Sequence, residues 1–213
     1  YILLAGVKTS AFVKSIQRAF NSAYPNFAEN SDYTTLNNDR HFQSMVKMLD
    51  DAGQKGAELI PLAEGEHNAE TRRFIPYLVL NAPQDSLVMQ EEIFGPILPV
   101  LEVKDVNEAV RYINRTPRPL SLYYFGHKNT DYVLNNTIAG GVCLNDTLLH
   151  MAQNDLPFGG IGSSGMGQYH GHDGFLTFSK QKAVMRQSRF NTSGMFRPPY
   201  AGWKERLLSF LTR

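Results

Sequence analysis

The feature of this sequence that most constrains its fold is a regular alternation of strand-like and helix-like segments. Short apolar runs are followed by longer segments in which apolar residues recur every three or four positions. Such an alternation is typical of an α/β fold in which helices cover a buried, largely parallel sheet. Strands are predicted at residues 1–7, 58–62, 74–80, 97–103, 120–125 and 141–145.

The helical segments carry recognisable ends. Thr9 or Ser10 can cap a first helix that runs to about residue 24. Asn38 opens a second helix, and Gly53 is expected just after its end. Further helices are predicted at residues 106–114 and 131–137, and a short one near the end of the chain carries Trp203, Leu207, Phe210 and Leu211 on one face.

Composition excludes several classes of protein. The chain has 213 residues, 42% of them hydrophobic, which suffices for one large domain or for one domain with an arm. Its 21 basic and 20 acidic residues give a net charge of +1 and form no basic block, so no nucleic-acid partner is predicted. No apolar run reaches the ~18 residues of a transmembrane segment. A single cysteine excludes an internal disulfide, and we expect a cytoplasmic protein.

A glycine-rich segment, residues 156–174, contains seven glycines and no apolar period. Within it, Gly160, Gly162 and Gly165 match the G-x-G-x-x-G spacing of dinucleotide-binding proteins. That fingerprint must leave a strand, open a helix and meet an acidic residue about 20 positions later. Here the preceding residues are poor strand material, and the next acid, Asp173, is too close. The segment is therefore predicted to be a loop that lies against another surface.

Two clusters of polar residues could carry chemistry, and each has a plainer interpretation. His170, His172 and Asp173 lie close together, but nothing completes the four ligands of a structural zinc site, so no metal is predicted. Glu91 and Glu92 are adjacent, and adjacent residues of a strand point to opposite sides. They are therefore not predicted to form a paired acid/base site.

Cys143, the one cysteine, lies within an apolar strand. A free cysteine is commonly a small buried hydrophobic residue. A reactive thiol would need a nearby cation, helix N-terminus or metal, and the local sequence offers none. We therefore interpret Cys143 as a structural residue, with a nucleophilic role as the alternative.

Several segments resemble aldehyde dehydrogenases of the class 3 type, which includes coniferyl and fatty aldehyde enzymes. Residues 91–99, Glu-Glu-Ile-Phe-Gly-Pro-Ile-Leu-Pro, resemble that family's signature around the nicotinamide ribose. Residues 156–171 resemble the glycine-rich loop of class 3 members, and residues 38–42 and 142–146 agree with the same subgroup. Residues 197–200 are similar to bacterial coniferyl aldehyde dehydrogenases in particular.

The resemblance implies a fold and a set of partners. It implies a three-layer α/β/α sandwich, the family's catalytic domain, at residues 1–182, followed by a C-terminal arm with a short amphipathic helix at residues 183–213. It implies NAD or NADP as the cofactor, an aromatic or medium-chain aldehyde as the substrate, and a homodimer. In the implied reaction, a cysteine thiolate attacks the aldehyde, a hydride passes to the nicotinamide, and a glutamate-activated water releases the carboxylate.

The resemblance also assigns roles to residues of this chain. Glu92 matches the acid that binds the nicotinamide ribose, where a carboxylate can accept from both hydroxyls, and Phe94 matches the aromatic residue that packs against the nicotinamide. The positions that match the lining of the aldehyde funnel are Leu148, Met151, Ala152 and Phe158, with His170 nearby. An apolar funnel would suit aromatic or medium-chain aldehydes.

The departures from the family pattern are as informative as the matches. The nucleophilic cysteine, general-base glutamate and oxyanion asparagine have no match here, so no catalytic residue is predicted in this chain and the chain alone is expected to be inactive. Residues 1–7 begin within a strand pattern, which predicts a piece of a longer protein. Two alternatives stay open: an acylating enzyme linked to coenzyme A or phosphate, and a non-catalytic interaction domain. The sequence decides neither the aldehyde nor the choice between NAD and NADP.

Overall fold

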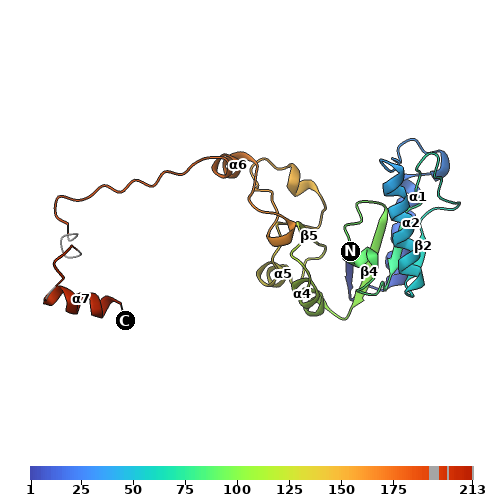
Figure 1. Cartoon of the computed structure of the whole chain (residues 1–213). Helices are drawn as coiled ribbons and strands as arrows, with labels where there is room; N and C mark the ends of the chain where they lie inside the picture. The colour runs from blue at the N-terminus through green and yellow to red at the C-terminus, as the bar shows by residue number, and fades with distance from the viewer. Residues whose placement is uncertain (192–196, 201, 213) are drawn as a thin grey trace.

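The computed structural model describes residues 1–191, 197–200 and 202–212. Its strands are β1 (Ile2–Ala5), β2 (Glu58–Pro61), β3 (Tyr77–Leu80), β4 (Ile97–Val103), β5 (Ser121–Tyr124) and β6 (Gly141–Leu144). They form a four-stranded sheet in the order β1-β4-β3-β2 and a two-stranded sheet of β5 and β6 (Figure 1). The α-helices are α1 (Thr9–Ala23), α2 (Asp39–Gln54), α3 (Leu87–Gln90), α4 (Val106–Arg115), α5 (Thr130–Asn136), α6 (Gly171–Thr177) and α7 (Trp203–Leu211). The 3-10 helices are η1 (Phe27–Glu29), η2 (Leu149–Ala152) and η3 (Gly162–Ser164).

The strand directions agree with the predicted, largely parallel fold. β1 and β3 both run parallel to β4, with Ile2 opposite Val100 and Tyr77 opposite Ile97. β5 and β6 are also parallel to each other. β2 alone runs antiparallel, to β3, and forms one edge of the larger sheet.

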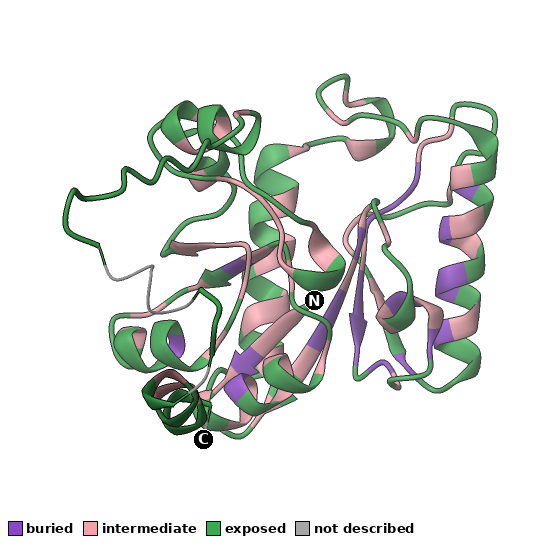
Figure 2. Cartoon of the chain, turned by 60° about the vertical axis from the view of Figure 1, so that its left-hand side comes forward, coloured by how far each residue is buried: buried purple, intermediate pink, exposed green. Residues whose placement is uncertain are grey.

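Two long helices cover opposite faces of the four-stranded sheet (Figure 2). α1 packs Phe12 and Ile16 against a core that contains Leu78 of β3. α2 packs Met45 into a second core that contains the neighbouring Val79. Successive residues of a strand point to opposite faces, so β3 contributes side chains to both cores. The predicted three-layer α/β/α arrangement is confirmed.

The two-stranded sheet and helices α4 and α5 form a second unit, which has a small core of its own. Val110 of α4, Leu122 of β5 and Val133 of α5 are buried together. Cys143 lies on β6, opposite Tyr123 of β5, and its side chain is only partly buried. The thiol was expected to be buried and is only partly buried, because the two-stranded sheet leaves its edge strands less covered than a wider sheet would.

The first helix and the third strand begin at other residues than predicted. α1 starts after Lys8, which makes no side-chain cap, and the hydroxyl of Thr9 instead donates to the carboxylate of Glu102. The strand predicted at residues 74–80 starts at Tyr77. Pro76 precedes it, and a proline has no N–H to give to a ladder of hydrogen bonds.

α2 begins as predicted and ends later. The side chain of Asn38 accepts a hydrogen bond of 2.8 Å from the backbone N–H of His41, which is the expected N-cap. Gly53 was expected beyond the C-terminus, but it lies inside the helix. The left-handed residue after this helix is Gly56, with φ of +91°.

The C-terminal part of the chain leaves the two sheets. The glycine-rich segment, predicted to be a loop throughout, also contains the start of α6. Residues 180–188 form neither helix nor strand and run away from both sheets (Figure 1). The short helix predicted near the end of the chain is present as α7, where Trp203, Phe210 and Leu211 are exposed. In the described part of the chain, no helix is long and apolar enough to cross a membrane.

Candidate functional site

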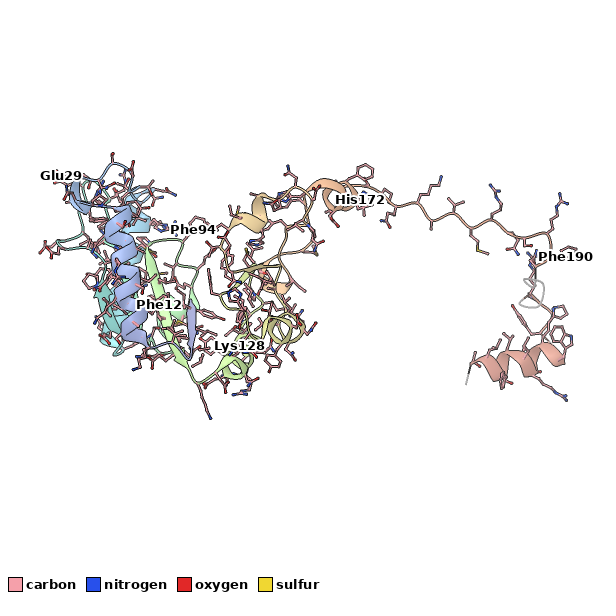
Figure 3. All side chains as sticks on the ribbon, turned by 180° about the vertical axis from the view of Figure 1, so that it is seen from behind. Phe12, Glu29, Phe94, Lys128, His172 and Phe190 are labelled. Carbon is pink, nitrogen blue, oxygen red and sulfur yellow. The ribbon has the colours of Figure 1, made fainter. Side chains whose placement is uncertain are left out.

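The turn between α3 and β4 carries the two residues predicted to meet a cofactor. Glu92 is exposed, and Phe94 is 77% exposed with φ of +48° (Figure 3). A left-handed backbone is uncommon for a bulky residue, and it persists only where the surroundings hold it. The neighbouring Gly95 packs closely against α2, because a Cβ there would lie 2.5 Å from the sulfur of Met45. The turn thus presses onto α2 and presents an aromatic ring to solvent.

A hollow of about 400 Å³ adjoins this turn. Phe94, Gly95 and Pro96 line one side of it, residues 33–37 another, and His41 of α2 also contributes. The Nε2 atom of His41 is buried and has no hydrogen-bond partner among the described residues. Residues 38–42, which include His41, resemble the class 3 subgroup, but that resemblance assigned His41 no role.

A partly buried arginine, Arg73, packs beside the start of the wall formed by residues 33–37. The guanidinium of Arg73 donates to the backbone carbonyls of Phe27 and Asn30. It also lies over the rings of Phe27 and Tyr33, at 5.5 and 5.8 Å from their centroids. The hydroxyl of Tyr33 donates to the carbonyl of Phe74 at 3.0 Å, and burial raises the pKa of Tyr33 to about 12. These contacts therefore hold residues 27–33, at the start of the wall, against residues 73 and 74.

Three of the residues predicted to line an aldehyde funnel lie on or beside η2. Leu148 precedes that turn with φ of +62° and is 60% exposed. Met151 is 45% exposed, and its backbone N–H donates to the carbonyl of Leu148 at 2.9 Å. Ala152 is exposed at the end of the turn. Exposed apolar side chains on a strained turn suit the wall of a binding site better than a core.

The other two predicted funnel residues meet through their rings. Phe158 and Tyr169 exchange two backbone hydrogen bonds, of 3.0 and 2.9 Å, in an isolated antiparallel bridge. This bridge places His170 beside Phe158, with ring centroids 6.2 Å apart and planes inclined by 26°. The Nδ1 atom of His170 is also 3.3 Å from the carbonyl oxygen of Leu156.

One residue that the sequence did not single out, His150, lies between these two groups. Its Nε2 atom is 3.2 Å from the hydroxyl of Ser121 on β5. Its ring makes edge-type contacts with Tyr123, at 5.7 Å between centroids, and a tilted contact with Phe158, at 5.9 Å. The predicted funnel residues of η2 are thus linked to Phe158 through His150.

The glycine-rich segment packs its backbone directly onto the second unit. A Cβ on Gly140 would lie 2.2 Å from the carbonyl oxygen of Gly159, and one on Gly159 would lie 2.1 Å from that of Gly167. A Cβ on Gly160 would likewise clash with the carbonyl oxygen of Ser164. The interpretation of this segment as a loop lying against another surface is therefore confirmed, since its glycines permit close packing of one backbone on another.

Within the residues that the structure describes, no group of three or more His, Cys, Asp or Glu side chains could hold a metal ion. Likewise, no described hydrogen bond or ring contact joins Glu92 or Phe94 to the funnel residues. The cofactor turn belongs to the larger sheet and the funnel to the smaller unit, so the two predicted sites lie on different parts of the fold.

Comparison with known proteins identifies the family. Residues 4–184 match the model of the aldehyde dehydrogenase family. The chain belongs to the aldehyde dehydrogenase family. The relatives of this aldehyde dehydrogenase chain include a probable coniferyl aldehyde dehydrogenase from Pseudomonas aeruginosa, which is 49% identical over 94% of this chain and 42% of its own length. The resemblance to bacterial coniferyl aldehyde dehydrogenases is confirmed.

Two solved structures have a fold similar to that of this chain. Staphylococcus aureus AldH in a substrate-bound state is 34% identical, with a TM-score of 0.77 over 99% of this chain and 46% of that one. A mutant of aldehyde dehydrogenase C from Pseudomonas syringae, in complex with NAD+ and octanal, is 26% identical, with a TM-score of 0.61 over 70% of this chain and 31% of that one. This aldehyde dehydrogenase chain spans less than half the length of each of these proteins.

Proposed function

We propose that the chain forms the C-terminal catalytic-domain part of an NAD(P)-dependent aldehyde dehydrogenase. In this proposal the enzyme oxidises an aromatic or medium-chain aldehyde, similar to coniferyl aldehyde, to the carboxylic acid through a cysteine thiohemiacetal. The observation that carries the proposal is the 49% identity with a probable coniferyl aldehyde dehydrogenase over 94% of this chain. The nucleophilic cysteine and the general base would come from the part of the relatives that this chain does not cover.

The turn at Glu92 and Phe94 fits the nicotinamide end of the cofactor. When bound, NAD or NADP would accept the hydride that leaves the substrate. Glu92 offers an exposed carboxylate that can accept hydrogen bonds from two ribose hydroxyls. Phe94 offers an exposed ring, next to a glycine that packs closely on α2, to pack against the nicotinamide. These residues orient the ring and take no part in bond making.

The funnel at η2 and the glycine-rich segment fits an apolar aldehyde. Leu148, Met151 and Ala152 give it one wall, and Phe158 with His170 gives it another. An aromatic or medium-length aldehyde would gain from burial against these side chains at roughly 25 cal/mol per Å² of apolar surface. This gain would be available to bulky aldehydes and largely lost to acetaldehyde.

The organisation of the parent enzyme follows from the same proposal. Residues 1–182 belong to the catalytic domain, and residues 183–213 form a C-terminal arm that ends in α7. The protein is a homodimer in the cytoplasm. Light scattering of the purified full-length enzyme tests the dimer, because a monomer would show half the expected mass.

One assay separates this function from its alternatives. The full-length enzyme that carries this chain is mixed with coniferyl aldehyde and either NAD or NADP, and the reduced cofactor and the product are both measured. The proposal predicts that the carboxylic acid of coniferyl aldehyde forms without added coenzyme A. A product that forms only with coenzyme A or phosphate would support an acylating enzyme. No cofactor reduction with any aldehyde would support a non-catalytic role.

A further inference from the structure

The side chain of His150 connects an exposed turn, η2, to the strand β5. η2 makes its backbone hydrogen bonds locally: Leu149 donates to Thr147, Met151 to Leu148, and Gln153 to His150. Among the described residues, the contact between His150 and Ser121 is the one hydrogen bond that joins η2 to a residue more than four positions away in the sequence. The imidazole therefore provides the one hydrogen bond that holds this turn against β5.

The surroundings of His150 are shaped to receive its ring. Ser121 and Tyr123 are two positions apart on β5, so their side chains lie on the same face of the strand. On the neighbouring strand, a Cβ at Gly141 would lie 3.0 Å from Cδ2 and 3.1 Å from Nε2 of His150. The ring thus occupies the space that a side chain on β6 would fill, and Gly141 leaves that space open.

The other side of the ring faces the second wall of the predicted funnel. Phe158 lies 5.9 Å from the imidazole, between centroids, and itself packs beside His170. A shift of His150 would therefore move η2 with Met151 on one side and remove one ring contact of Phe158 on the other. His150 thus contacts both walls of the predicted funnel.

We infer that His150 is a positioning residue that sets the aldehyde range of the enzyme, by fixing η2 to Ser121 and packing against Phe158. The inference rests on the proposed function, since it assigns η2 to the aldehyde funnel. His150 acts here through Met151, Ala152 and Phe158. It takes no proton and forms no bond to the substrate.

The test compares a bulky and a small aldehyde in the full-length enzyme. The variants are Ser121→Ala, which removes only the hydrogen-bond partner, His150→Leu, which removes the imidazole, and His150→Gln, which retains a polar group near Nε2. The matched control is His127→Gln, at an exposed histidine that follows β5. For each variant, kcat and KM are measured with coniferyl aldehyde, acetaldehyde and NAD, together with the melting temperature.

The inference predicts a split between substrates. Ser121→Ala and His150→Leu should raise KM for coniferyl aldehyde about tenfold, since misplacement of a binding group by ~1 Å can cost up to ~100-fold. The kinetic constants for acetaldehyde and KM for NAD should stay within about twofold, by the same argument, because neither depends on the funnel walls. His150→Gln should fall between His150→Leu and the unmutated enzyme, and His127→Gln should behave as the unmutated enzyme.

Two results would overturn the inference while leaving the proposed function intact. One is an equal loss of activity with both aldehydes that follows the melting temperature, which would mean that His150 only stabilises the fold. The other is an unchanged KM for coniferyl aldehyde in the folded Ser121→Ala variant. An unmutated enzyme that oxidises neither aldehyde would overturn the proposed function and the positioning role together.

Discussion

The imidazole of His67 lies flat against the ring of Phe74, with 3.8 Å between centroids and 15° between planes. The Nδ1 atom of His67 accepts a hydrogen bond of 3.0 Å from the backbone N–H of Ile75. An accepting Nδ1 requires the neutral ring with its proton on Nε2. Burial against these residues also lowers the pKa of His67, because it penalises the charged form.

This contact predicts how stability changes with pH. The folded-state pKa of His67 lies below the unfolded value of about 6.5, so the unfolded chain binds the proton first as pH falls. The stabilising contribution is therefore present above pH ~6.5 and is lost as pH decreases from there through the lower folded-state pKa. We expect the melting temperature of the protein to fall between pH 7.5 and pH 5.

The variant His67→Asn isolates this effect, because its Oδ1 can accept from Ile75 but does not titrate. Its melting temperature should fall less over the same pH range than that of the unmutated protein. An equally steep fall in both proteins would assign the pH dependence to other groups.

Gly140 is predicted to tolerate no side chain. A Cβ at this position would lie 2.2 Å from the carbonyl oxygen of Gly159 and 2.6 Å from that of Leu120. Both atoms belong to the backbone and cannot turn aside, so Gly140→Ala should destabilise the fold by about 1–3 kcal/mol, as other overpacked sites do. Chemical denaturation measures the loss.

Gly53→Ala is the matched control for Gly140→Ala. Gly53 lies inside α2, and its added Cβ would meet only the flexible end of Leu59, at 3.3 Å. Alanine is favoured over glycine in a helix interior by up to ~1 kcal/mol, so this variant should be neutral or more stable. Equal effects of the two substitutions would contradict the packing argument.

The two glycines also show how far the sequence predicts this fold. The periodic apolar residues of α2 and the cap at Asn38 were enough to predict that helix. They placed its end at Gly53 and not at Gly56, because both glycines satisfy the local pattern. The structure distinguishes them by the backbone angle of +91° at Gly56 and by the hydrogen bonds that close the helix there, from Gly56 to Gly53 and from Ala57 to Ala52.

The candidate site was predicted where it consists of contiguous motifs and missed where it depends on distant contacts. Glu92 and Phe94 belong to one uninterrupted segment that resembles a family signature, so they were found without the fold. His150 meets Ser121, 29 positions earlier, and although Leu148, Met151 and Ala152 beside it were singled out, no local pattern links it to Ser121. Such a pair can be recognised only in the folded structure, where β5 and β6 pair and η2 packs beside them.

Glu92→Gln in the full-length enzyme should lower turnover more than it weakens cofactor binding. The carboxylate is exposed in this chain and would hold only the ribose beside the nicotinamide. A misplaced ring should cost about tenfold to a hundredfold in kcat. The dissociation constant for NAD, measured by titration calorimetry, should change by only a few-fold.

Glu91→Gln is the control for Glu92→Gln. Glu91 is also exposed, one position earlier, at the C-terminal end of α3. It should retain normal turnover. If both variants keep the turnover of the unmutated enzyme, Glu92 has no role in orienting the cofactor.

Cys143 is predicted to be dispensable for catalysis although it is the one cysteine of the chain. It lies on β6, partly buried, and Tyr123 lies opposite it on β5. A catalytic thiol typically accounts for several orders of magnitude in turnover. Cys143→Ala removes one sulfur atom from a partly covered site, so we expect a stability loss of about 1 kcal/mol or less, at the low end of core truncations. Turnover of the folded full-length variant should stay close to normal. A variant with an unchanged melting temperature and turnover reduced a thousandfold would place the nucleophile at Cys143, and the proposal that it comes from outside this chain would then be wrong.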